Sequence, residues 1–122
     1  MKREEYITAE EKKRCRKVAD AFLEFYDMTD TIVVDAGRYG FVKLQYYKRS
    51  DGFDSMVTYT DSKEMFDDLW QDWFANRLLM LVKGTVLEEL EYEEIFRCLP
   101  EEKQEEIMKK RCYFKNKSDL NL

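Results

Sequence analysis

In three short segments in the first half of the chain, apolar and polar residues alternate. The segments on either side of them have apolar residues at helical spacing. The alternating segments are 32–36, 41–47 and 55–59, and glycine-containing turns at 37–40 and 50–52 join them. A period of two is typical of half-buried strands, and such short connections predict an antiparallel meander. A three-stranded sheet with one apolar face is not stable alone, so helices must cover that face.

Capping boxes mark where two of these helices begin. The pairs are Thr8 with Glu11 and Asp61 with Glu64. In a capping box each side chain satisfies a free backbone N–H of the first helical turn. The first pair opens a predicted helix over 9–28, and the second opens a longer one over 62–83 that stops at Gly84. Because the longer helix places Trp70 and Trp73 in a wide apolar stripe, we expect it to be the lid on the sheet.

The C-terminal third predicts two shorter helices. Pro100 ends the first of them and favours the first turn of the second. The second is expected over 101–111, and its thin apolar face predicts a peripheral position. The fold class is therefore α+β, in the order α-β-β-β-α-α-α, with a three-stranded antiparallel meander packed by the long tryptophan-bearing helix. We expect a single domain over residues 1–122, with frayed ends at about 1–7 and 115–122.

The second strand predicts what each face of the sheet carries. We expect Val42, Leu44 and Tyr46 to form the core face. The opposite face then carries Phe41 and Tyr47 around Lys43 and Gln45, with Met56 on the neighbouring strand. Exposed aromatic residues at this density are typical of a partner-binding or dimer patch. The alternative is that they lie under the first helix.

Acidic residues dominate one region of the chain. The chain holds 26 acids and 21 bases, a balance that disfavours wholesale binding to nucleic acid or to an anionic membrane. Residues 88–106 carry nine of the acids and two bases, and we single out Glu93, Glu94, Glu101 and Glu102 as candidate partner-binding residues. One interpretation is an acidic protein that inhibits a nucleic-acid-binding protein or a toxin by charge mimicry. The alternative is an ordinary solvated helix surface.

The composition removes the common forms of catalysis. The chain has no histidine, which is the commonest catalytic base, and its four glycines match no phosphate-binding loop. A pair formed by Asp35 with an acid of the long helix, Asp67, Asp68 or Asp72, is the one catalytic arrangement that the sequence suggests. Solvent-exposed acids on a helix give the same sequence pattern as such a pair, so we expect no catalytic residue, cofactor or small-molecule substrate.

The three cysteines do not indicate a metal site or a disulfide framework. They are widely spaced, without a Cys-x-x-Cys pair and without histidine. Cys15 and Cys98 fall on the apolar stripes of predicted helices, so we expect both thiols to be buried.

The remaining signals concern location and partner. The basic residues of 12–17 lie beside acids and lack a recognition motif, so we do not expect nucleic-acid binding. The N-terminus lacks the apolar core of a signal peptide, and the longest apolar run, 78–82, is too short for a bilayer. The sequence therefore predicts a cytoplasmic, non-enzymatic protein–protein interaction or regulatory domain that binds a protein partner or itself.

Overall fold

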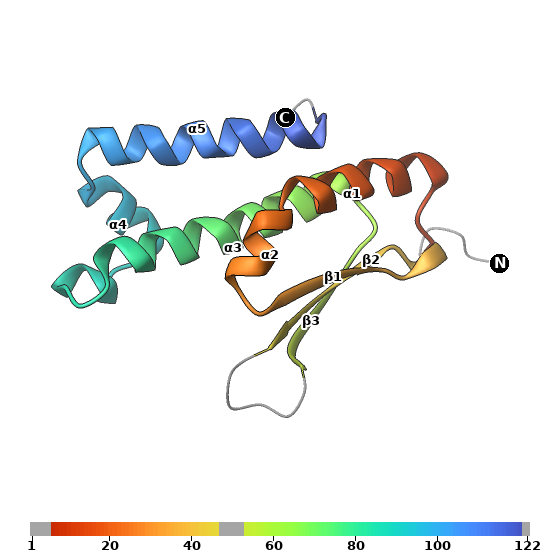
Figure 1. Cartoon of the computed structure of the whole chain (residues 1–122), viewed down its shortest axis with the longest axis horizontal. Coiled ribbons are helices and arrows are strands. Elements are labelled where there is room, and N and C mark those ends of the chain that lie inside the picture. The colour runs from red at the N-terminus through yellow and green to blue at the C-terminus, as the bar shows by residue number, and fades with distance from the viewer. Residues whose placement is uncertain (1–5, 47–52, 121–122) are drawn as a thin grey trace.

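The computed structural model describes the backbone of residues 6–46 and 53–120 and the side chains of 6–46 and 56–120. Its elements confirm the predicted α+β class and element order. In chain order they are α1 (Ala9–Ala21), α2 (Leu23–Met28), β1 (Thr31–Asp35), the 3-10 helix η1 (Gly37–Tyr39), β2 (Phe41–Tyr46), β3 (Phe53–Tyr59), α3 (Ser62–Val82), the 3-10 helix η2 (Val86–Glu89), α4 (Tyr92–Cys98) and α5 (Glu101–Ser118). The helices lie on one side of the sheet, and α3 runs along the length of the molecule (Figure 1).

The sheet is an antiparallel meander with β2 in the centre. Gly40 joins η1 to β2 with a φ of 100°, a conformation that favours glycine. A Cβ atom at this position would lie 2.0 Å from the backbone oxygen of Tyr59. Glycine is therefore required where the chain enters the central strand.

The two faces of the sheet are reversed relative to the prediction. Phe41 and Lys43 are each 3% exposed and lie on the helix side, while Val42 and Leu44 are only half-buried on the other side. The prediction that Val42, Leu44 and Tyr46 form the core face is wrong. Phe41 takes the alternative place, under α1, where the Lys12 ammonium lies 4.6 Å from its ring centroid. The physical reason is Lys43, whose pairing with acids of α3 directs the odd-numbered positions of β2 toward the helices.

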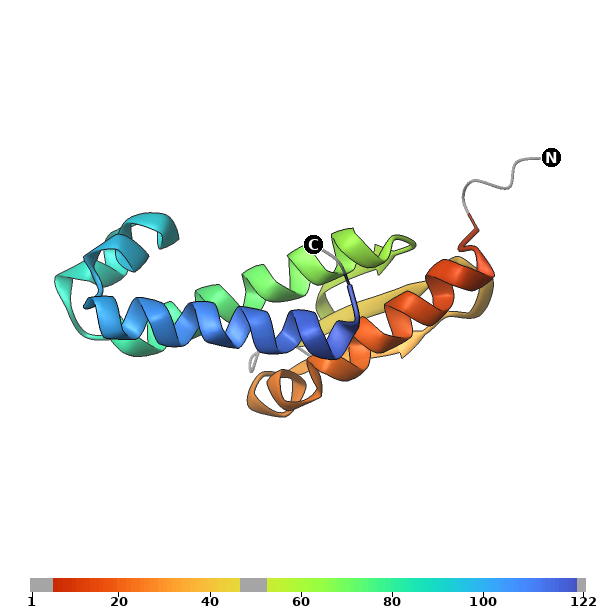
Figure 2. The same ribbon diagram turned by 90° about the horizontal axis from the view of Figure 1, so that it is seen from above.

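The long helix α3 is the predicted lid. It begins at Ser62 and ends at Val82, and it buries both tryptophans. Asp61 caps it by accepting a hydrogen bond from the backbone N–H of Glu64 at 2.9 Å. α1 lies beside α3 next to the sheet, and α5 packs on both of these helices on the side away from the sheet (Figures 1 and 2). Among the described residues, no helix has the length and apolar character to cross a bilayer.

The first predicted helix is in fact two helices. Phe22, with φ of −101° and ψ of 15°, separates α1 from α2. Its side chain is fully buried and packs against the rings of Phe66 and Phe114. The break lets α2 turn down toward β1. A large core residue at this point explains why apolar spacing alone suggested one continuous helix.

The last helix is longer and more central than predicted. It continues to Ser118, so residues 115–118 form its final turn. It packs against both α1 and α3, and its buried residues include Ile107 and Phe114. The prediction of a peripheral helix over 101–111 is therefore wrong, because Phe114 carries much of its apolar contact.

The N-termini of α1 and α3 share one side chain. Thr8 caps α1 by accepting a hydrogen bond from the backbone N–H of Glu11 at 3.1 Å. Glu11 does not return this bond in the manner of a closed capping box. Its carboxylate instead accepts bonds from the backbone N–H and the hydroxyl of Ser62, at 2.8 and 3.0 Å. A residue read as a local signal thus ties two helices together, 51 positions apart in the chain.

The burial of the cysteines agrees with the prediction at Cys15 and differs from it at Cys98. Cys15 is buried as expected, and burial, with the nearby Glu11 carboxylate, raises the pKa of its thiol to about 11. At neutral pH this thiol is protonated and therefore unreactive. Cys98 is exposed, so the prediction that it is buried is wrong. It ends the short helix α4, of which Ile95 is the buried residue.

Asp35, at the end of β1, ties the sheet to α1. Its carboxylate accepts hydrogen bonds from Lys12, Arg16 and the backbone N–H of Gly37. The Lys12 bond, followed by the Gly37 bond, lowers the pKa of Asp35 to about 2. Of the α3 acids with which a catalytic pair was considered, Asp68 and Asp72 bind Lys43.

We expect Asp35→Asn to change how stability depends on pH. The pKa of Asp35 in the folded state lies below its unfolded value of about 4, so its bonds stabilise fully above pH ~4 and are lost as the pH falls toward 2. The variant should therefore have a lower Tm at pH 7, by a few degrees, and a shallower fall of Tm between pH 5 and 2. Thermal unfolding followed by circular dichroism measures both. Asp27→Asn is the matched control, since Asp27 is exposed and forms no ion pair among the described residues; equal curves for the two variants would contradict the prediction.

Candidate functional site

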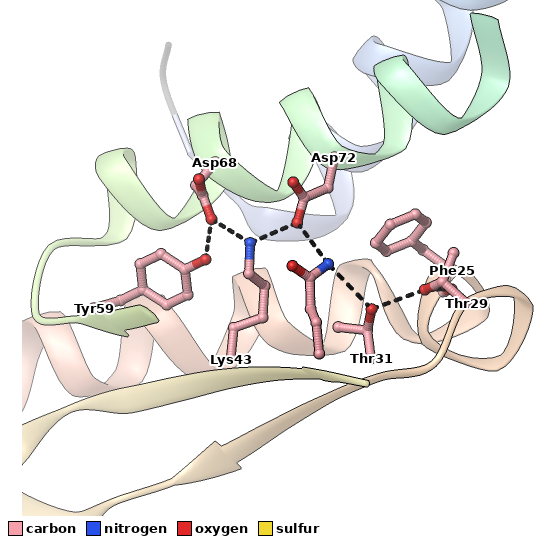
Figure 3. A network of polar contacts seen from close by, with 8 residues as sticks. Phe25, Thr29, Thr31, Lys43, Tyr59, Asp68 and Asp72 are labelled. Atoms are coloured by element: carbon pink, nitrogen blue, oxygen red, sulfur yellow. Dashed lines mark hydrogen bonds and ion pairs between the residues drawn. The ribbon is translucent and has the colours of Figure 1, made fainter. Parts of the chain in front are cut away.

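A chain of polar contacts runs between the sheet and α3. Lys43 extends from the centre of β2 toward the helix, and its Nζ donates to Oδ2 of Asp68 at 2.7 Å and to Oδ2 of Asp72 at 2.5 Å (Figure 3). The hydroxyl of Tyr59 donates to the same oxygen of Asp68. Gln45 continues the chain from Asp72. Lys43, at the centre of the network, is 3% exposed, whereas the carboxylates of Asp68 and Asp72 are 40% and 26% exposed.

The network holds Lys43 in its charged form. Burial alone would lower the pKa of this lysine, but the hydrogen bonds to Asp68 and Asp72 outweigh burial and raise it. Burial also raises the pKa of Asp72, and the Lys43 ammonium opposes that change. We take the ionised pair as the state at neutral pH, since one ammonium meets two carboxylates. A lysine acts as a nucleophile only when it is neutral, so this arrangement suits a structural ion pair.

A hollow adjoins the far end of the network. It has a volume of about 310 Å³ and is bordered by Asp72, Asn76 and Phe25, among others. The hypothesis of a carboxylate enzyme would place its substrate here, beside Asp72. That hypothesis stays a prediction. Among the described residues, no group of three or more acids and cysteines is arranged to hold a metal ion.

The side of the sheet that faces away from the helices is the second candidate. It consists of two rows of side chains across the three strands, which we call the open face. The rows are Ile32, Leu44 and Met56, and Val34, Val42 and Thr58. Met56 is 70% exposed and Ile32 is 42% exposed. No described helix or strand covers this side (Figure 1).

The helix-covered side is the more polar of the two. Its rows across the strands include Val33, Lys43 and Val57, and Asp35, Phe41 and Tyr59. The open face holds five aliphatic or methionine side chains and one threonine, and none of its described side chains is charged. The sheet therefore exposes its more apolar face and covers the face that carries ionised groups. This is the reverse of the usual arrangement of a sheet with one solvated face.

The candidate residues from the sequence lie in three different places. Glu93 and Glu94 occupy the first turn of α4, Glu101 and Glu102 occupy the first turn of α5, and all four are exposed. Acids are favoured there by the helix dipole, which provides a structural reason for them. Phe41 is a core residue under α1, and Tyr47 lies outside the described residues.

Only the geometry of the structure provides evidence of function. Comparison with protein families, with curated proteins and with solved structures finds no match to this chain.

Sequence reasoning missed both the network and the open face for one reason. It treated Asp68 and Asp72 as solvated acids, although their i,i+4 spacing on α3 places them on one face of that helix. A lysine in the central strand beside such a pair is the signal that could have found the network. Placing Lys43 inward would then have placed Val42 and Leu44 outward.

Proposed function

We propose that this protein is a non-enzymatic interaction domain that binds an uncharged, apolar surface of a protein through the open face. The observation that carries the proposal is the reversal of the sheet, which leaves Ile32, Val34 and Met56 exposed to solvent. Exposed aliphatic side chains scattered singly are ordinary. A contiguous set across three strands is typical of an interaction site.

The size and charge of the open face support a protein as the partner. It is continuous across three strands, and contiguous apolar patches of a few hundred Å² on monomers are often functional. The chain as a whole is 39% charged, but no described side chain of the face is charged. An apolar partner surface loses water contact without leaving an unpaired charge on this side.

The polar network supports binding over catalysis. Lys43 is held charged between Asp68 and Asp72, away from solvent. Its role in this proposal is to fix the distance and angle between the sheet and α3. The open face is then a rigid surface, and a rigid surface loses little conformational entropy on binding.

Site-specific photo-crosslinking tests the proposal. A photoreactive amino acid in place of Met56 should form adducts with a defined protein in cells that express the chain at natural levels, as identified by mass spectrometry. Val34→Lys should abolish these adducts, because it places a charge in the contact. The fold should tolerate this change, since Val34 is 39% exposed.

The matched control places the same photoreactive residue at Met108. This methionine is 47% exposed on α5, in the helical layer. Adducts at position 108 that equal those at position 56, or adducts at position 56 that survive Val34→Lys, would contradict the proposal.

A further inference from the structure

The open face has the chemistry of a surface that binds itself. In a two-fold symmetric contact, each residue meets residues of the same patch on the other copy. A charged patch is poor for this purpose, because like charges then face one another. The described side chains of the open face avoid the problem, since all six are uncharged, although the chain carries a net charge of −5.

Resting on the proposed function above, we propose that the partner on the open face is a second copy of this chain, bound as a symmetric, reversible dimer. The two sheets would stack face to face, about 10 Å apart. Each copy already has a helical layer on its other side. In the dimer the two sheets therefore lie in the middle with helices on both outer sides, and the apolar face of each sheet becomes interior.

We infer one orientation for the two copies, in which each row packs on itself. With the two-fold axis parallel to β2 and midway between the sheets, β1 of one copy lies over β3 of the other. Each row then meets its own counterpart in reverse order. Met56 packs on Ile32 of the second copy, Leu44 packs on Leu44, and Val34 packs on Thr58. The most exposed side chain of the face, Met56, thereby meets a β-branched residue that is itself 42% exposed.

The number of contacting side chains limits how tightly the two copies bind. Each copy contributes six side chains of the open face, against about 20–30 residues a side in a standard interface, so the contact belongs to the weak and transient class. We therefore expect a dissociation constant on the order of 100 µM, with monomers at low concentration. Salt should strengthen the dimer, because it screens the repulsion between two chains of equal net charge.

Sedimentation velocity from 10 µM to 2 mM tests the proposal. The mass of the wild type should rise from one chain toward two. Met56→Lys should remain monomeric throughout, because it buries an unpaired charge against the apolar Ile32 of the second copy. Met108→Lys, the matched control on α5, should dimerise as the wild type does. The fold of Met56→Lys is checked by circular dichroism, and a position that is 70% exposed should tolerate the change.

A charge-pairing experiment tests the orientation. Ile32→Glu should also be monomeric by itself. A mixture of Ile32→Glu with Met56→Lys should form the dimer again, because the two new charges lie opposite one another across the two-fold axis. A chain that stays monomeric to 2 mM overturns the proposal, as does a dimer that Met56→Lys leaves intact or a mixture that fails to associate.

The same measurements separate this proposal from the proposed function. A monomeric chain whose position 56 still crosslinks to a different protein overturns the dimer and supports the interaction domain. A monomeric chain with no specific adduct at position 56 overturns both.

Discussion

Lys43→Met should lower the free energy of unfolding by about 3 kcal/mol, since removal of one partner leaves buried charges unpaired. The methionine side chain fits the apolar part of the space, so the loss comes from Asp68 and Asp72. Both carboxylates keep some contact with water, at 40% and 26% exposure, which places the loss at the low end for buried pairs. Urea unfolding followed by tryptophan fluorescence measures it as a shift in midpoint at constant slope.

The pH dependence of the Lys43→Met variant identifies the cause. Burial holds the pKa of Asp72 above its usual value in the folded state, and Lys43 opposes this effect. Without the lysine, protonation of Asp72 favours the folded state, so the stability of the variant should rise as the pH falls through the raised pKa of this residue. Lys63→Met is the matched control, because Lys63 is exposed and forms no ion pair among the described residues. A Lys43→Met variant that behaves like this control would show that the network contributes nothing.

Phe114→Ala should cost about 3–5 kcal/mol, the range for a fully buried phenylalanine. Its ring stacks on Phe22 with centroids 4.3 Å apart and meets the edge of Trp73 at 5.6 Å. Deleting the ring leaves a cavity at the point where α1, α3 and α5 meet. Because a domain of this size has about 5–15 kcal/mol of stability in total, the variant should be only marginally folded.

Tyr113→Ala provides the comparison for Phe114→Ala. It removes the neighbouring ring of the same helix, which is 42% exposed, and should cost about 1 kcal/mol or less. Similar losses for the two variants would mean that α5 is as peripheral as its sequence suggested.

The sequence predicted correctly those features that depend on residues close together in the chain. The caps at Thr8 and Asp61 predicted the starts of α1 and α3, because a cap depends on residues three positions away. The order of strands followed from the short turns, with Gly40 as the position that no other residue can occupy. These features explain why the fold class and the topology could be predicted.

The errors arose where a contact with a distant part of the chain determines the local structure. Lys43 enters the core because Asp68 and Asp72, 25 and 29 positions later, receive its charge. Successive side chains of a strand point to opposite faces, so an error of one residue exchanges the two faces. Because the ion pair of Lys43 was not predicted, the two faces of the sheet were assigned the wrong way round and the open face was not recognised. Phe22 illustrates the same limit, because its helix break is stabilised by Phe114, which follows far later in the chain.

The contact of α1 with α5 also has a consequence for synthesis. About 80 residues separate the end of α1 from the start of α5, which a ribosome takes roughly 4–16 s to add at 5–20 residues per second. During that interval Phe22 lacks the ring of Phe114 that stacks on it. Every nascent copy therefore passes through a stage in which this aromatic side chain lacks part of its packing, and a polysome places several such copies side by side.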